Sequence, residues 1–82
     1  MPDKRIIEIV KSFINDLKHK GVFCDEVYLF GSQLKGVAKE TSDIDVLLIS
    51  PQFDEEDEEI LAKIWFSKIR TENRIEPILI TP

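Results

Sequence analysis

Four positions in the middle of the chain combine residue types that can hold a phosphate group and a metal ion. Gly31 and Ser32 follow one apolar run, and ten residues separate Ser32 from Asp43 and Asp45, which open the next run. A glycine lets the backbone approach a ligand, and a serine at the start of a turn offers a hydroxyl and an N–H to phosphate. On a strand, Asp43 and Asp45 share one face about 7 Å apart, so they favour a cation such as Mg²⁺, which binds carboxylate and phosphate oxygens together.

Three β-strands are predicted to position these residues. Runs rich in β-branched and aromatic residues cover 26–30 (EVYLF), 44–49 (IDVLLI) and 74–81 (RIEPILIT). For Ser32 to meet the aspartates, the first two strands must be antiparallel. The third strand supplies Glu76, which lies beside Asp45 only if the second and third strands are parallel. Pro77 predicts an edge position or a local break in pairing for this last strand.

Two amphipathic helices accompany the strands. From Asp3 to Lys20, apolar residues recur every three or four positions, with Asp3 as a plausible N-cap and Gly21 as a stop. A second helix is predicted from about residue 54 to 70. Its acidic beginning, DEEDEE, suits the first turn of a helix better than it suits a metal-binding tract. The predicted apolar stripe of this second helix consists of Ile60, Leu61, Ile64, Trp65 and Ile69.

These elements predict an α+β fold in one domain over residues 1–82, with a small mixed sheet flanked by α-helices. The order is helix, strand, turn or short helix, strand, helix, strand. Residues 32–42 are too polar for a strand and could form the short helical turn. The second long helix has the length that a crossover between parallel strands requires.

Composition excludes several classes of function. The 82 residues carry a formal net charge of -5, so general binding to nucleic acid is not expected, because that depends on basic side chains that neutralise phosphates. No apolar segment approaches the roughly 20 residues that span a bilayer. Cys24 is the only cysteine, which excludes an intrachain disulfide and weakly favours a reducing compartment. A cytoplasmic location is therefore expected.

The central motif resembles that of a known family. Gly31-Ser32, ten residues, then Asp43-x-Asp45 resembles the GS-x10-D-x-D signature of the DNA polymerase beta-like nucleotidyltransferase superfamily, and the small size resembles its minimal nucleotidyltransferase branch. The flanking segments LFGS, SDIDVLLI and IEPILI agree with this resemblance, which covers nearly the whole chain.

The resemblance implies a nucleotidyltransferase fold and a role for each matching residue. Asp43, Asp45 and Glu76 would bind catalytic Mg²⁺, with two ions in the active complex, and Glu76 would also serve as a candidate general base. Gly31 and Ser32 would hold the β- and γ-phosphates of a nucleoside triphosphate. The implied reaction transfers a nucleoside monophosphate, most simply AMP from ATP, to a hydroxyl group.

Other basic and aromatic residues leave alternatives open. Many small relatives have an arginine in the turn where this chain has Lys35, which keeps the charge and loses the bidentate fork toward phosphate. Lys39 and Arg74 are further candidates for the triphosphate, and Arg74 could equally pair with Glu76. The aromatic residues Tyr28, Phe30 and Trp65 could stack on a base, although core packing is the favoured interpretation.

The second strand turns apolar on both faces beyond its carboxylates, and two helices offer little to cover both. The resemblance suggests a helical partner of the HEPN type, a toxin for which this chain would be the antitoxin; a homodimer would also cover an apolar patch. Two functions follow. One is a nucleotidyltransferase that modifies its partner, and the other is a non-catalytic nucleotide-binding module that masks it.

Overall fold

The computed structural model describes residues 4–30, 43–53 and 57–82. The elements follow the predicted order, with the possible short helix lying outside the described residues. They are α1 (Lys4–His19), β1 (Glu26–Phe30), β2 (Ile44–Ile49), α2 (Glu58–Thr71) and β3 (Ile75–Ile80). None of the helices in these three ranges is long and apolar enough to cross a membrane.

The three strands form one mixed sheet in the order β1-β2-β3. β1 and β2 pair antiparallel, with Phe30 opposite Asp45. β2 and β3 pair parallel, with Asp45 opposite Glu76. Both predicted strand directions are confirmed. Pro77 lies in β3 at the edge of the sheet, where its missing N–H removes little pairing.

Helix α1 forms where the sequence pattern predicts it. Its buried residues recur at helical spacing and comprise Ile6, Val10, Phe13 and Leu17. The helix ends in a Schellman arrangement: the Gly21 N–H donates to the Lys18 carbonyl and the Val22 N–H donates to the Leu17 carbonyl. Gly21 has φ +83°, a left-handed conformation that glycine adopts without steric cost. The predicted N-cap, Asp3, lies outside the described residues.

Helix α2 begins later than the sequence analysis predicted. Asp57 is its N-cap, and the Asp57 carboxylate accepts a hydrogen bond of 3.1 Å from the Ile60 N–H. The helix therefore starts at Glu58, not near residue 54, because the side chain of Asp57 satisfies a backbone donor that has no partner within the helix. Residues 54–56 lie outside the described residues. Glu58 and Glu59 still place acidic charge in the first turn, as predicted.

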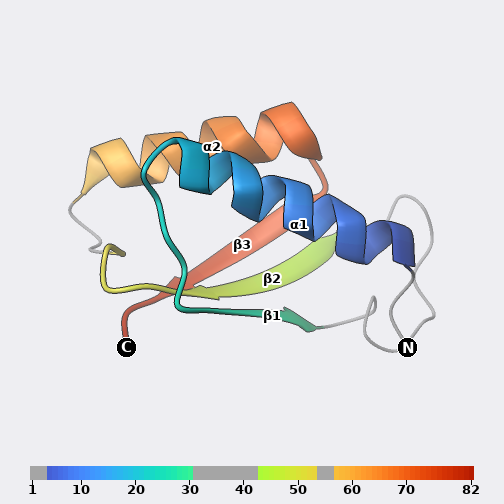
Figure 1. The fold of residues 1–82 in the computed structure, drawn as a ribbon, viewed down its shortest axis with the longest axis horizontal. Coiled ribbons are helices and arrows are strands. Elements are labelled where there is room, and N and C mark those ends of the chain that lie inside the picture. The colour runs from blue at the N-terminus through green and yellow to red at the C-terminus, as the bar shows by residue number, and fades with distance from the viewer. Residues whose placement is uncertain (1–3, 31–42, 54–56) are drawn as a thin grey trace.

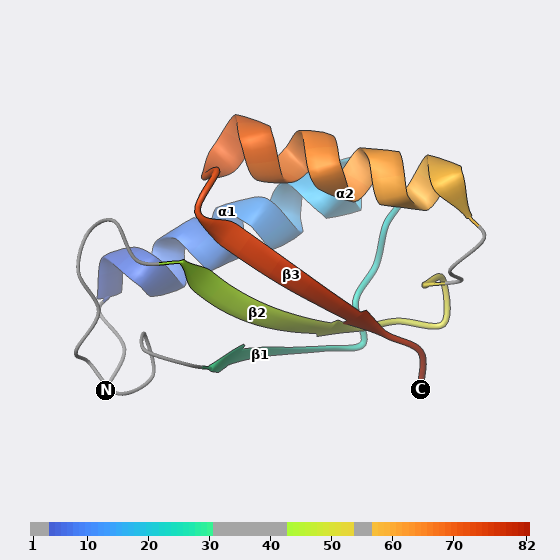
Figure 2. The same ribbon diagram turned by 180° about the vertical axis from the view of Figure 1, so that it is seen from behind.

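Both helices cover the same face of the sheet, as Figures 1 and 2 show from opposite sides. Strand residues on this closed face are fully buried and comprise Ile44, Val46, Leu48 and Ile75. The alternate residues face the other way. On β3 these are Glu76, Ile78 and Ile80, all of them exposed. We call this second side the open face, because neither α1 nor α2 covers it.

The orientation of α2 corrects the predicted apolar stripe. The buried row consists of Ile60, Ile64, Ser67 and Lys68, which follow helical spacing. Leu61, Trp65 and Ile69 point outward together with Phe66, which is 64% exposed. The helix carries apolar residues on two sides, so the sequence did not determine which side meets the sheet. Core packing was also the wrong expectation for Trp65 and Tyr28, which are 56% and 50% exposed.

A polar cluster connects the two helices inside the closed layer, which consists of α1, α2 and the sheet face that they cover. Lys20 Nζ donates a 2.8 Å hydrogen bond to the buried hydroxyl of Ser67 and lies 3.1 Å from Asp16 Oδ2. This second contact is an ion pair whose geometry is not aligned for a hydrogen bond. A hydrogen bond from the Ser67 side chain, helped by Lys20, lowers the pKa of Asp16 although burial acts in the opposite direction.

Candidate active site

The sheet register brings Asp45 and Glu76 side by side. They are direct partners on the parallel strands β2 and β3, and the alternation of each strand directs both side chains to the open face. Phe30, the last residue of β1, is the partner of Asp45 on the other side. The last residue of β1 therefore lies beside Asp45. Gly31, Ser32 and Lys35 lie outside the described residues.

Asp43 directly precedes β2 and is exposed. It lies two residues before Asp45, at the beginning of β2. Glu76 lies near the beginning of the parallel strand β3, so the Asp-x-Asp pair and Glu76 lie at the same end of the sheet. Over the described ranges, however, no group of three acidic, histidine or cysteine side chains is close enough together to hold a metal ion. The register aligns the backbone positions of the carboxylates without gathering all three side chains.

Lys68 is a residue of this region that the sequence analysis did not select. It lies in the last turn of α2, its side chain is only 7% exposed, and its Nζ lies 3.7 Å from Glu76 Oε1. A lysine in the last turn of a helix is also expected from the helix dipole alone, so its presence there does not single it out. Its spacing of four and eight residues from Ile64 and Ile60 is the signal that could have placed it in the buried row.

Comparisons with known proteins identify the family of this chain. The family model described as "Nucleotidyltransferase domain" matches residues 7–82. The chain belongs to the nucleotidyltransferase domain family. The match spans the helix, the strands and all three candidate carboxylates, and it confirms the family that the central motif resembles.

One solved structure supports the fold of this nucleotidyltransferase domain. It is a crystal structure of a "putative nucleotidyltransferase" from Sulfolobus solfataricus, with a TM-score of 0.62 and 24% sequence identity. The alignment covers 94% of this chain and 68% of that chain. The likeness extends to the fold alone at this level of identity. No curated protein matches the chain.

Around the carboxylates, Arg74 connects β3 to β2. Its carbonyl accepts a 2.8 Å hydrogen bond from the Ile44 N–H, which fixes the start of β3 beside the start of β2. Its Nε lies 3.2 Å from Glu72 Oε1, and this hydrogen-bonded contact lowers the pKa of the Glu72 carboxyl. Arg74 thus pairs with Glu72, and Glu76 lies within ion-pair distance of Lys68. Lys39 lies outside the described residues.

The donor chemistry fits a divalent cation in this nucleotidyltransferase domain. Asp45 and Glu76 supply carboxylate oxygens from adjacent strands, and Asp43 adds a third from the same end of the sheet. Oxygen ligands of this kind suit Mg²⁺. The three side chains are not gathered into one ligand set among the described residues, so a complete set would require side-chain rearrangement.

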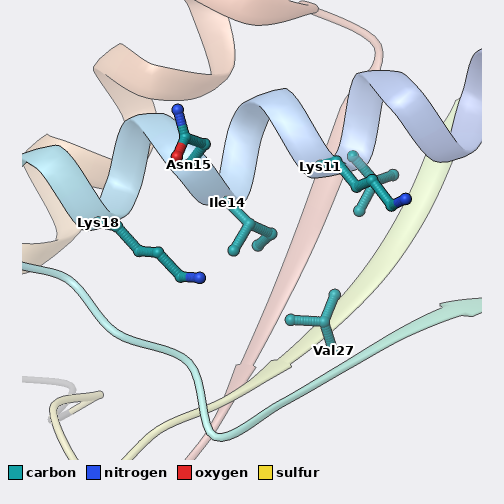
Figure 3. Close-up of a pocket in the computed structure, with 6 residues that line it drawn as sticks. Lys11, Ile14, Asn15, Lys18 and Val27 are labelled. Atoms are coloured by element: carbon teal, nitrogen blue, oxygen red, sulfur yellow. The ribbon is translucent and has the colours of Figure 1, made fainter.

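A separate pocket lies between α1 and the beginning of β1 (Figure 3). Its apolar part includes Ile14 and Val27, and the two lysines that line it, Lys11 and Lys18, lie about two turns apart on α1. Val27 pairs with Leu48, at the other end of β1 from the residue that faces Asp45. This pocket is therefore not part of the carboxylate site. It is lined by Val10, Lys11, Ile14, Asn15, Lys18 and Val27.

Proposed function

We propose that this nucleotidyltransferase domain is a Mg²⁺-dependent enzyme that transfers a nucleoside monophosphate, AMP from ATP, to a hydroxyl group of a partner protein. The observation that carries the proposal is the pairing of Asp45 with Glu76 at the end of β1 from which the Gly-Ser segment continues. This register supports a phosphate-binding segment and a carboxylate pair at one end of the open face.

Each residue has a role in this proposal. Asp43 and Asp45 would hold Mg²⁺, with Glu76 completing the ligand set, and Gly31, Ser32 and Lys35 would bind the β- and γ-phosphates. Bound Mg²⁺ would neutralise the negative charge that develops on the phosphate oxygens, as in two-metal sites. Neither α1 nor α2 covers the open face, so the α-phosphate of a nucleotide bound there would be accessible to an acceptor from another molecule.

The proposed reaction is an in-line displacement at the α-phosphorus. The acceptor hydroxyl oxygen forms a bond to the α-phosphorus, and the bond from that phosphorus to the oxygen bridging to the β-phosphorus breaks. Pyrophosphate leaves with the bonding electrons, and the hydroxyl proton passes to a carboxylate, for which Glu76 is the candidate. The acceptor therefore gains AMP, which contains the α-phosphate of the ATP.

Transfer of an α-phosphate label tests the proposal. The protein is incubated with ATP labelled at the α-phosphate, Mg²⁺ and the protein encoded by the neighbouring gene. We expect label on that partner, release of pyrophosphate, and loss of both in the Asp43→Asn/Asp45→Asn variant. Labelling that persists in the double variant would refute the assigned metal site.

A second candidate function is supported by the exposed side of α2. Leu61, Trp65, Phe66 and Ile69 form an apolar surface that would be buried by a helical partner. In this alternative the chain is a non-catalytic module, and it masks a HEPN-type toxin, or forms a homodimer, without modifying a partner. Neutralisation of the toxin by both the wild type and the double variant, with no label on the toxin, would favour this function.

A further inference from the structure

Lys68 brings a buried positive charge to the edge of the proposed metal site. Its Nζ lies 3.7 Å from Glu76 Oε1 and 4.6 Å from the centre of the Trp65 ring. The Glu76 side chain is 51% exposed, whereas only 7% of the Lys68 side chain is exposed. The ammonium group is therefore close to both a carboxylate and an aromatic ring, on a side chain with little exposed surface.

Because the Lys68 side chain is buried, its ion pair with Glu76 matters more to the free energy of the protein than an exposed pair does. Removing an ammonium group from water is unfavourable unless an opposite charge compensates it. Glu76 supplies that charge, and the face of Trp65 adds a cation–π contact. Lys63, on the same helix, also pairs with a glutamate, Glu59, at 3.4 Å, but both of those side chains are accessible to solvent and screened by it.

The carboxylate that Lys68 holds is also the third proposed metal ligand. Two cations thus compete for Glu76: the ammonium group, which is part of the fold, and the divalent ion, which must bind from solution. One oxygen of Glu76 lies toward Lys68, and Asp43, Asp45 and Glu76 are not gathered into one ligand set among the described residues.

Resting on the proposed function, we infer that Lys68 is a positioning residue that holds Glu76 in the nucleotide-free protein and so weakens divalent-cation binding at this site. The negative charge of a bound triphosphate would offset the charge of Lys68 and allow Glu76 to join the ligand set. Metal and nucleotide would therefore bind with positive coupling, each raising the affinity for the other.

The affinity of the nucleotide-free protein for Mn²⁺, measured by electron paramagnetic resonance of the free ion, tests this inference. Lys68→Met removes the charge and keeps an unbranched apolar side chain, and we expect it to raise the affinity about tenfold, because a nearby like charge no longer opposes the ion. Lys68→Arg keeps the charge and should match the wild type. The matched control is Lys63→Met, which removes an exposed lysine from the same helix and should also match the wild type.

A Lys68→Met affinity within about twofold of the wild type, or weaker, would overturn the inference. A second measurement covers the case in which this variant does not fold. In wild-type protein with ¹³C-labelled lysine, the Cε signal of Lys68 should shift as Mg²⁺ saturates the site, because its carboxylate partner leaves. A signal that does not move during saturation would also overturn the inference.

Two further variants separate this inference from the proposed function. If Asp45→Asn abolishes Mn²⁺ binding while Lys68→Met leaves it unchanged, the inference is wrong and the proposed metal site stands. If Glu76→Gln leaves Mn²⁺ binding unchanged when it is added to Lys68→Met, in which Lys68 no longer holds Glu76, then Glu76 is not a ligand and the competition does not exist. If Asp45→Asn binds Mn²⁺ as tightly as the wild type does, or if neither the wild type nor any variant binds Mn²⁺, both the inference and the proposed metal site are refuted.

Discussion

The two faces of the sheet use the same strands for different purposes. On the closed face, Ile44, Val46 and Ile75 have no exposed surface and form the core with both helices. On the open face, Asp45 and Glu76 lie next to each other, and beyond Glu76 the exposed residues of β3 are isoleucines. Because side chains alternate along a strand, residues one position apart serve stability and chemistry. The core that stabilises the fold thus lies on the closed face, whereas neither helix packs on the open face, which carries the candidate carboxylates.

Two isoleucines of β3 provide the strongest test of this difference. Ile75→Ala should lower the free energy of unfolding by about 2 to 5 kcal/mol, because it leaves a cavity in the closed layer. Ile78→Ala removes the same atoms from the open face, where the side chain is 46% exposed, and should cost less than about 1 kcal/mol. Urea denaturation of both variants measures the difference. Equal losses would show that the open face is part of the stable core.

Two hydroxyl groups test the same contrast for polar contacts. Ser67 is fully buried and accepts a hydrogen bond from Lys20, so Ser67→Ala should lower the unfolding free energy by about 1 to 3 kcal/mol, because the Lys20 and Asp16 groups lose a partner. Tyr28 donates to Glu26 at 2.6 Å on the open face, and Tyr28→Phe should leave stability unchanged, since water replaces the contact. Thermal unfolding of both variants measures the two losses of stability. A larger loss in Tyr28→Phe than in Ser67→Ala would show that the exposed hydroxyl contributes more than the buried one, contrary to this expectation.

The polar cluster of the closed layer should also make stability depend on pH. The pKa of Asp16 is lower in the folded protein than in the unfolded chain, so its contribution is complete above the unfolded value of about 4. This contribution is lost as the pH falls from there through the lower folded value. Denaturation midpoints measured from pH 6 to pH 2 should fall less steeply in Asp16→Asn than in the wild type. Identical slopes would show that Asp16 does not contribute.

The outward side of α2 is expected to contribute least to the stability of the chain itself. Phe66→Gln should change the free energy of unfolding by less than about 0.5 kcal/mol, because the side chain is mostly in solvent. The same variant should weaken any assembly that buries this side of α2. Light scattering after size-exclusion chromatography, over a range of concentrations, gives the mass of each species. A loss of more than 1 kcal/mol in the variant, measured by urea denaturation, would mean that Phe66 packs within the chain.

Much of the fold could be predicted from the sequence because local and long-range requirements agreed. The alternation in residues 44–49, the turn-forming Gly21 and the need to bring Ser32 and Glu76 to the Asp-x-Asp pair determined the elements and both strand directions. The acidic run before α2 was correctly assigned to a helix start, but the position of the cap depended on one side chain, Asp57, among several acidic residues that could each have served.

The rest depended on packing, which a single helix pattern does not specify. Apolar residues surround much of α2, so periodicity placed Ile64 and Trp65 in one stripe, although Ile64 is buried and Trp65 is exposed. For the same reason Lys68 was not predicted in the buried row, nor its contact with Glu76, which depends on how α2 lies along β3. The register of Asp45 and Glu76 was predictable, whereas the position of the Glu76 carboxylate was not.

Binding of ATP with and without Mg²⁺ is the most direct test of the claim that the carboxylate end of the open face is a nucleotide site. Isothermal titration calorimetry would compare the wild type with Asp45→Asn, and with Asp25→Asn as a matched control, since Asp25 directly precedes β1 at the other end of the sheet. We predict that the wild type and Asp25→Asn bind ATP at least about tenfold more tightly with Mg²⁺ than without it, and that Asp45→Asn loses this dependence. Equal affinities for all three proteins, with and without Mg²⁺, would contradict the account.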